Sequence, residues 1–113
     1  MQIQNRVFGD VTLLTLTGRL TVNEHPGLLK EAVDAAVGAG TRHIVIDLSD
    51  VHYVDSTRLG ELMAAQVTVS RHGGRLKLAG TPPRVLDLLT MAGLADIFER
   101  FDSAEQALQS LAG

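Results

Sequence analysis

The apolar run Ile44–Leu48 (IVIDL) constrains the fold more than any other part of this sequence. Apart from Asp47 the run is apolar on both faces, which suits a strand that is covered on both sides. Such strands are typical of the centre of a parallel or mixed sheet. Helices usually connect parallel strands, and the run therefore predicts an α/β domain with helices packed on the sheet.

Alternating and helical apolar patterns predict the elements around this strand. A hairpin is expected from strands over 3–8 and 11–17, joined by Gly9 and Asp10. A helix is expected with Asn23 as N-cap and Pro26 in its first turn, ending at Gly38 and Gly40. A loop is expected over 49–55, followed by a helix that begins near Ser56 and is stopped by 72–74. A strand over 76–79, a helix that starts from the turn over 80–83 and is capped by Gly93, an edge strand over 97–98 and a last helix capped by Ser103 complete the prediction.

The predicted core combines apolar residues from the central strands and from the helix that follows the loop. Its members are Val11, Leu13, Leu16, Ile44, Ile46, Leu48, Leu59, Leu62, Leu76 and Leu78. No linker, repeat or low-complexity tract interrupts the pattern, so residues 1–113 are interpreted as one domain.

Composition excludes several classes of function. Ten Lys and Arg stand against 13 Asp and Glu, giving a net charge of −3, which argues against a nucleic-acid binder or adhesion to an anionic membrane. Cysteine is absent, which excludes thiolate metal sites and thiol nucleophiles. His25, His43, His52 and His72 show no metal-ligand spacing, and no cofactor is expected.

The N-terminal residues contain no apolar stretch of the kind found in signal peptides. No apolar run approaches the roughly 20 residues needed to span a bilayer. A cytoplasmic protein without direct membrane insertion is therefore expected.

The segment 44–62 carries the functional information: a buried strand leads through a loop to Asp55, Ser56 and Thr57 at the start of a helix. Backbone N–H groups are unpaired at a helix start, and the helix dipole favours an anion there. The Ser56 hydroxyl is therefore either a helix cap or a phosphate acceptor. Spacing alone favours a cap.

The segment 47–60 (DLSDVHYVDSTRLG) resembles the motif of the STAS family, which includes the anti-sigma-factor antagonists. Gly18–Leu20 is similar to the family's G-R-L segment. The stretch 83–94, followed by Ile97 and Phe98, is similar to its C-terminal pattern, and 102–108 fits its last helix. The resemblance implies a mixed sheet of four or five strands with helices packed mainly on one face.

The resemblance also implies a bacterial partner-switching function without enzymatic activity. The antagonist binds an anti-sigma factor that is a serine kinase, and this binding releases a sigma factor for transcription. The kinase phosphorylates the motif serine, here Ser56, the complex dissociates, and a serine phosphatase resets the switch. The partner-binding residues expected on this basis are Thr21, Asp50, His52, Asp55, Ser56, Thr57, Arg58 and Glu61. A monomer or weak homodimer is expected.

Some roles stay open at this level. Asp55 is either a structural residue that holds the loop or caps the helix, or a functional one that orients the Ser56 hydroxyl or contacts the partner. Thr57 is either a secondary acceptor or a cap or core-facing residue. Arg58 stands where the family usually has Gly, and Thr21 where many members have Asp. The Arg58 side chain is expected in solvent, with pairing to a phosphate on Ser56 or obstruction of a kinase as alternatives.

Two other functions compete with the switch. A STAS domain that is not phosphorylated can serve as a scaffold in a stress-sensing complex or a lipid-transport ABC system. His52, Asp55 and Ser56 also hold the residue types of a hydrolase triad, but they lie too close together on one loop and lack a G-x-S-x-G elbow. The patch formed by Arg71, His72, Arg75 and Lys77 is interpreted as a solvated face.

Overall fold

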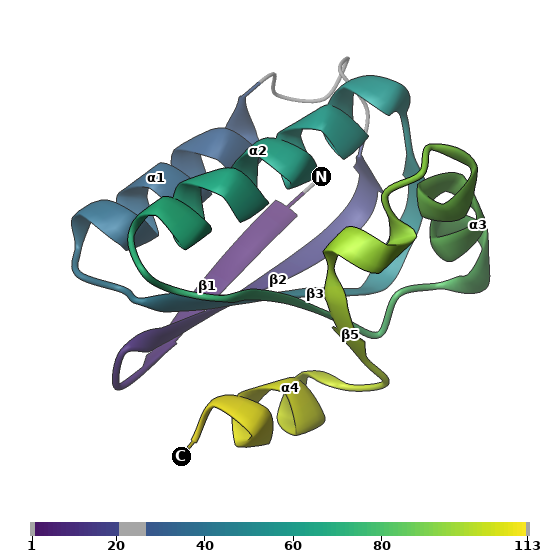
Figure 1. Cartoon of the computed structure of the whole chain (residues 1–113). Helices are drawn as coiled ribbons and strands as arrows, with labels where there is room; N and C mark the ends of the chain where they lie inside the picture. Colours follow the sequence, from purple (N-terminus) through teal and green to yellow (C-terminus); the bar gives the residue numbers. More distant parts are fainter. Residues whose placement is uncertain (1, 21–26, 113) are drawn as a thin grey trace.

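The computed structural model describes residues 2–20 and 27–112, in which a five-stranded sheet is combined with α-helices (Figure 1). Thr21, Asn23, His25 and Pro26 lie outside the described residues. The elements in chain order are β1 (Gln2–Phe8), β2 (Val11–Leu20), α1 (Leu28–Gly38), β3 (His43–Val54), α2 (Ser56–Arg71), β4 (Leu76–Ala79), α3 (Pro83–Met91), the short 3-10 helix η1 (Ala95–Ile97), β5 (Glu99–Phe101) and α4 (Ala104–Leu111).

The strands follow one another across the sheet in the order β1-β2-β3-β4-β5. β1 and β2 form the predicted antiparallel hairpin, in which Phe8 pairs with Val11, and the other neighbouring strands are parallel. Gly9 adopts a positive φ of 63°, which a two-residue hairpin turn requires and glycine supplies without strain. The predicted mixed α/β sheet is confirmed.

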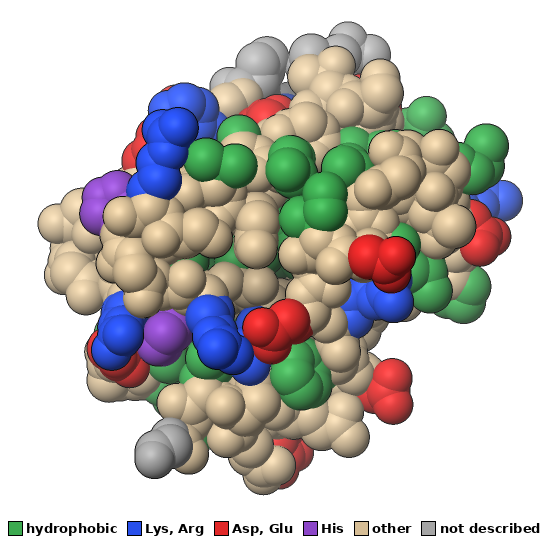
Figure 2. All heavy atoms as spheres, viewed as in Figure 1, with side chains coloured by type: hydrophobic (Ala, Val, Ile, Leu, Met, Phe, Trp, Pro, Cys, Tyr) green, Lys and Arg blue, Asp and Glu red, His purple; other side chains and the backbone are tan. Residues whose placement is uncertain are grey.

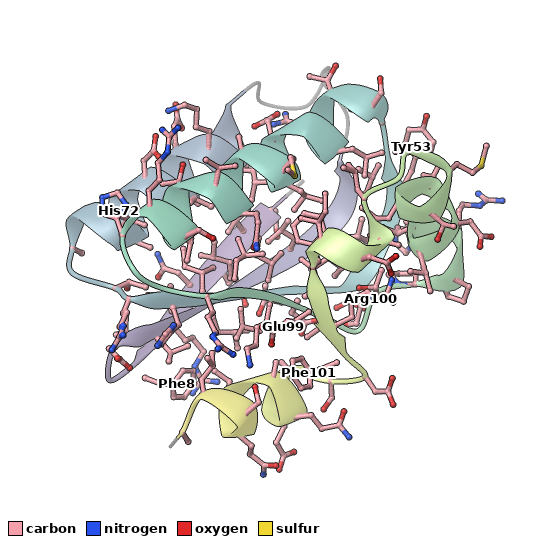
Figure 3. All side chains as sticks on the ribbon, viewed as in Figure 1. Phe8, Tyr53, His72, Glu99, Arg100 and Phe101 are labelled. Atoms are coloured by element: carbon pink, nitrogen blue, oxygen red, sulfur yellow. The ribbon has the colours of Figure 1, made fainter. Side chains whose placement is uncertain are left out.

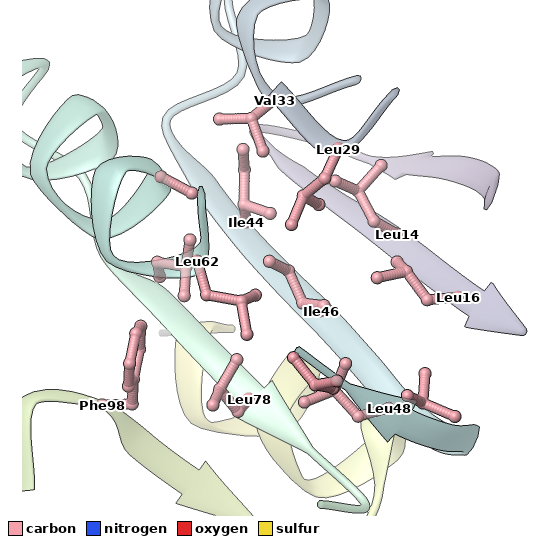
Figure 4. Packing of buried hydrophobic residues seen from close by; sticks show 14 of the residues in the cluster. Leu14, Leu16, Leu29, Val33, Ile44, Ile46, Leu48, Leu62, Leu78 and Phe98 are labelled. Carbon is pink, nitrogen blue, oxygen red and sulfur yellow. The ribbon is translucent and has the colours of Figure 1, made fainter. Parts of the chain in front are cut away.

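Three helices cover one face of the sheet and the fourth covers the other face (Figure 1). The larger apolar cluster joins α1, α2 and α3 to the sheet, and Figure 4 shows Leu29, Val33 and Leu62 packed over Ile44 and Ile46. On the opposite face Ala107 of α4 packs on a smaller cluster that includes Val45. All ten residues of the predicted core are buried.

β3 is longer than predicted, and the expected loop over 49–55 is wrong. The strand continues to Val54, pairing with β2 as far as Leu20 through two register shifts. Polar residues such as Ser49 and Asp50 give this segment the appearance of a loop in the sequence. Val51 and Val54 are nevertheless buried in the larger cluster, and the long β2 strand offers a partner for their backbone.

The last edge strand is also displaced from its predicted position. Ile97 belongs to η1 and Phe98 is buried against the core, whereas the strand pairs Glu99–Phe101 with β4. The final helix begins where predicted, because the Ser103 hydroxyl accepts a hydrogen bond from the Gln106 N–H at 3.2 Å. The Gln106 side chain accepts one in return from the N–H of Asp102.

Candidate functional site

Ser56 is the first residue of α2 and lies directly beyond the end of β3. β3 is the central strand of the sheet, and the pairing of its last residues, Tyr53 and Val54, with β2 fixes the place where the helix begins. The Ser56 side chain is exposed. The fold therefore presents this hydroxyl at one end of the sheet, at the amino end of a 16-residue helix.

Asp55, and not Ser56, caps this helix. Its backbone is extended, and a carboxylate oxygen accepts a hydrogen bond from the Arg58 N–H at 2.9 Å. The Asp55 carbonyl accepts the first helical hydrogen bond from Leu59. These contacts are the geometry of an aspartate N-cap. The capping role leaves the Ser56 hydroxyl outside the cap.

Thr57 is exposed beside Ser56, so its expected role as a cap or a core-facing residue is wrong. The cap position is occupied by Asp55, and the inward positions of the first two turns are filled by Arg58, Leu59 and Leu62. Two neighbouring hydroxyls are thus exposed at the start of α2.

Arg58 is buried, which corrects the expectation that it lies in solvent. Its side chain has 0% exposure, and a guanidinium nitrogen lies 2.6 Å from a carboxylate oxygen of Glu61 on the next turn. Residues two apart on a helix point to different sides, so Arg58 is directed inward while Ser56 faces out. The long side chain therefore does not extend over the helix start, and obstruction of an approaching kinase is not expected from this geometry.

The outward face of α2 carries no charge over the three turns that follow Ser56, and Arg71 is on this side only in the last turn. Residues at spacings of four, seven, eight and eleven from the serine share its side of the helix. They are Gly60, Met63, Ala64 and Val67. Gly60 and Ala64 are exposed, and Val67 is 37% exposed. Figure 2 shows hydrophobic side chains gathered over α2 in the middle of the visible face. We call this set, headed by Ser56, the α2 face.

Val67 belongs to the apolar pattern of α2 but not to its inward side. The inward stripe is completed by Ala65 and Val69, which are buried, and Val67 lies outside it. The α2 face is identified by the helical spacing of its residues from Ser56. This spacing can be used once the Asp55 cap fixes where the helix begins.

The other predicted site residues differ in their exposure and in the element that carries them. Asp50 and His52 are exposed near the end of β3, and Glu61 is partly buried on α2. Tyr53, which sequence analysis did not select, is 36% exposed at the same end of the sheet as α3 (Figure 3). Thr21 falls outside the part of the chain that the structure describes.

A hydrolase triad does not form from the predicted residue types. The Asp55 carboxylate caps the helix, and no hydrogen bond joins His52 to Ser56 within the described residues. No group of three His, Asp or Glu side chains suited to a metal ion occurs in residues 2–20 and 27–112. Over the same ranges, no helix has the length and apolar character needed to cross a membrane.

Lys77 is buried, which corrects the prediction that it belongs to a solvated basic patch. Arg71, His72 and Arg75 are exposed, but Lys77 is 3% exposed on β4 under α4. Its ammonium lies 3.1 Å from a Glu99 carboxylate oxygen, 2.8 Å from the Ser110 hydroxyl and 5.0 Å from the centre of the Phe101 ring. Figure 3 shows Glu99 and Phe101 on this side of the sheet, facing α4.

Comparison with known proteins identifies the family of this fold and site. The family model described as Mlab, STAS domain matches residues 4–100. An anti-sigma-B factor antagonist of Bacillus subtilis (strain 168) is 34% identical over 97 residues, which cover 85% of this chain and 86% of that protein. An anti-sigma F factor antagonist of Paenibacillus polymyxa is 26% identical and covers 98% of this chain and 95% of its own.

Solved structures share the fold at lower sequence identity. The anti-sigma factor antagonist SpoIIAA in its unphosphorylated form has a TM-score of 0.81 at 17% identity and covers 99% of this chain and 97% of its own. The phosphorylated form of SpoIIAA, a Bacillus cell fate determinant, has a TM-score of 0.76 at 16% identity and covers 97% and 99%. The family model spans most of the sequence and the Bacillus subtilis relative exceeds 30% identity, so this chain belongs to the STAS-domain family.

Proposed function

We propose that this protein is an anti-sigma factor antagonist that binds an anti-sigma factor serine kinase through the α2 face and the end of β3. The observation that carries the proposal is the position of Ser56, exposed at the head of a helix face that is uncharged over its first three turns. The names of its relatives in Bacillus subtilis and Paenibacillus polymyxa support the same function. In this role the protein is a substrate of phosphoryl transfer and not its catalyst.

The proposed control step is phosphorylation of Ser56. The Ser56 oxygen attacks the γ-phosphorus of ATP, a new oxygen–phosphorus bond forms, and the bond to the β-phosphate oxygen breaks to release ADP. The hydroxyl proton passes to a base of the kinase. Removal of the phosphate by hydrolysis, catalysed by a serine phosphatase, restores the hydroxyl.

The site accommodates a phosphate without refolding of the antagonist. The amino end of α2 favours negative charge, and the Asp55 cap holds the first turn in place. Phosphorylation adds about −1.5 to −2 charges at pH 7. Arg58 is turned inward and paired with Glu61, so in this arrangement its guanidinium does not neutralise the added charge.

The effect of the phosphate is therefore expected at the partner surface. An uncharged face suits burial against a partner, and a dianion at its edge must be desolvated or expelled when the complex forms. A tenfold loss of affinity corresponds to about 1.4 kcal/mol. Burial of an unpaired charge readily exceeds that value, so one phosphate is expected to weaken the complex by more than tenfold.

Affinity capture from the native cells tests the proposal with four baits: wild type, Ser56→Ala, Ser56→Asp and Thr57→Ala. The Thr57 variant is the matched control, because Thr57 is also an exposed hydroxyl in the first turn. A serine kinase captured by all baits except Ser56→Asp supports the switch. The captured kinase with ATP should then phosphorylate Thr57→Ala but not Ser56→Ala.

The scaffold function predicts a different outcome of the same experiment. Equal capture of transporter or stress-complex subunits by all four baits, together with no phosphate on the wild-type protein, would overturn the switch at Ser56.

A further inference from the structure

The outer edge of β1 is the longest free strand edge among the described residues. β1 has seven residues, contains no proline and pairs only with β2, whereas the strand at the opposite edge of the sheet, β5, has three residues. Unpaired backbone groups on a long edge are a template for another strand. The single charged residue of β1 is Arg6, which gives the edge little protection of its own.

The hairpin geometry determines which backbone groups of β1 face this edge. Gly9 has a positive φ and Asp10 does not, as in a type II′ turn, so the closing pair of Phe8 and Val11 is hydrogen-bonded. Hydrogen-bonded pairs alternate along an antiparallel ladder, and the even-numbered residues of β1 therefore bond to β2. The outward-facing N–H and C=O groups belong to Ile3, Asn5 and Val7.

We propose that a second copy of this chain pairs with β1 in antiparallel orientation, with the two-fold axis between the two Asn5 residues. In this register Ile3 pairs with Val7 of the second copy, and Gln4 lies opposite Arg6 of the second copy. All seven residues of the strand take part, and every outward-facing backbone group of Ile3, Asn5 and Val7 finds a partner. The two sheets then form one continuous sheet.

The side chains of β1 are complementary to themselves in this register. Val7 is 68% exposed in the single chain, and the pairing places Ile3 of the second copy beside it. Apolar cross-strand pairs of this kind stabilise neighbouring strands. Both such pairs lie on the face of the sheet that α1 and α2 cover, where Ile3 already packs against the larger cluster.

The positions of the two Arg6 charges also favour this register over the neighbouring registers. Centred on Asn5, the pairing keeps the two Arg6 side chains apart and sets each opposite a neutral glutamine. A two-fold axis at Arg6 would place the guanidinium groups directly opposite each other, which is destabilising. Arg6 also lies over the ring of Phe8 at 5.3 Å, and Phe8, 42% exposed at the tip of the hairpin (Figure 3), then lies opposite Gln2 of the second copy.

The pairing is compatible with a partner on the α2 face. α2 packs over β3 and β4, whereas β1 forms the edge beyond β2. A dimer through β1 therefore carries two copies of the Ser56 region on one particle. The proposal does not depend on the phosphorylation switch, because it rests on the edge of the sheet alone.

Single cysteines test the register, since the natural sequence has none. Gln4→Cys and Arg6→Cys are prepared with tags of different mass, and each is oxidised alone and in an equal mixture. Opposed residues of a non-hydrogen-bonded pair have Cα atoms about 4.5 Å apart, within the range for a disulfide. The expected result is a covalent heterodimer in the mixture and little product from either variant alone, because identical positions lie about 7–8 Å apart on the diagonal.

Sedimentation velocity tests the association itself. Wild type is expected to form a dimer as its concentration is raised, and Asn5→Lys is expected to remain a monomer because two like charges meet at the axis. An equal mixture of Asn5→Lys and Asn5→Glu should dimerise again, with unchanged circular dichroism in every variant. A monomeric wild type at all soluble concentrations, or Arg6→Cys cross-linking to itself as readily as to Gln4→Cys, would overturn the proposal.

Discussion

The Arg58 guanidinium lies 2.6 Å from the Glu61 carboxylate, and together they place an ion pair on the inward side of α2. The Arg58 side chain has 0% exposure and that of Glu61 has 20%. A charge without solvent must be compensated by partners, and removal of one partner from a buried pair is far more costly than removal of both. The pair thus makes the first turns of α2, which carry Ser56, dependent on a charge interaction.

Glu61→Ala should destabilise the protein by about 3 kcal/mol, because the buried guanidinium loses a charged acceptor. Glu61→Gln, which retains an oxygen acceptor, should lose less. Chemical denaturation of each variant gives the free energy of unfolding. The double variant Arg58→Met with Glu61→Ala should be more stable than the sum of the two single effects predicts, because no buried charge remains.

The control for this prediction is the ion pair between Lys30 and Asp34 on α1. Its side chains are 70% and 47% exposed, and exposed pairs contribute roughly 0–1 kcal/mol. Lys30→Ala should therefore change the free energy of unfolding only slightly. Equal effects of Lys30→Ala and Glu61→Ala would show that burial of Arg58 is not what makes its pair important.

A second prediction concerns the cap of α2. Asp55→Ala removes the acceptor for the Arg58 N–H and should cost about 1 kcal/mol, whereas Asp55→Ser keeps a capping oxygen and should cost less. Thermal or urea unfolding measures both. Asp55→Ser also separates the two roles considered for this residue: retained stability with lost kinase capture would assign Asp55 to the partner surface as well as the cap.

Local signals account for the parts of the fold that the sequence predicts well. Gly9 and Asp10 mark the hairpin, the apolar run Ile44–Leu48 marks the central strand, and Ser103 marks the last helix. Each depends on residues close together in the chain. The ten predicted core residues follow from the same periodicity, and all are buried.

The predictions that are wrong concern residues whose structure is determined by elements distant in the sequence. The polar segment after Leu48 becomes strand because β2 continues alongside it, which the segment itself does not reveal. Arg58 and Lys77 are buried because neighbouring elements cover them and Glu61 and Glu99 supply charge. Lysine and arginine side chains are usually exposed, so residue type alone predicts exposure for both of these residues.

A third prediction is a loss of stability in mild acid through His43. Burial lowers the pKa of His43 below its usual 6.5, and nearby Arg42 adds to this effect while Asp10 opposes it. The ring nitrogen Nδ1 accepts a hydrogen bond from the Arg75 N–H at 3.0 Å, which requires that nitrogen to be unprotonated. The folded state therefore binds the proton less readily than the unfolded state.

The pH window follows from the direction of this shift. Well above pH 6.5 both states are neutral at His43 and its contribution is complete. As the pH falls below 6.5 the unfolded state takes up the proton first, so stability decreases until the folded pKa is reached. One proton limits the slope to about 1.4 kcal/mol per pH unit. His43→Asn, which does not titrate, should show a smaller decrease in urea unfolding between pH 7.5 and 5.5, and an identical profile would contradict the assignment.

The glycine pair after α2 provides the fourth prediction, because its two members are required for different reasons. Gly73 has a φ of +75° and open space around the position of a Cβ atom. Gly74 has an ordinary φ, but a Cβ there would lie 1.6 Å from the backbone oxygen of Arg42. The turn is held at both ends, since the Gly74 N–H donates to the Val69 carbonyl and the Arg42 side chain donates to the Gly73 carbonyl.

Gly73→Ala should therefore cost about 1–2 kcal/mol, the price of a left-handed backbone, and Gly73→Asn less, because asparagine tolerates that conformation. Gly74→Ala must displace a backbone segment at the start of β3 and should cost more than about 3 kcal/mol. Urea unfolding of the three variants measures the order. If Gly74→Ala proves as stable as Gly73→Ala, then the turn can move away from Arg42, and the close approach of the two segments is not needed to position β3 beneath α2.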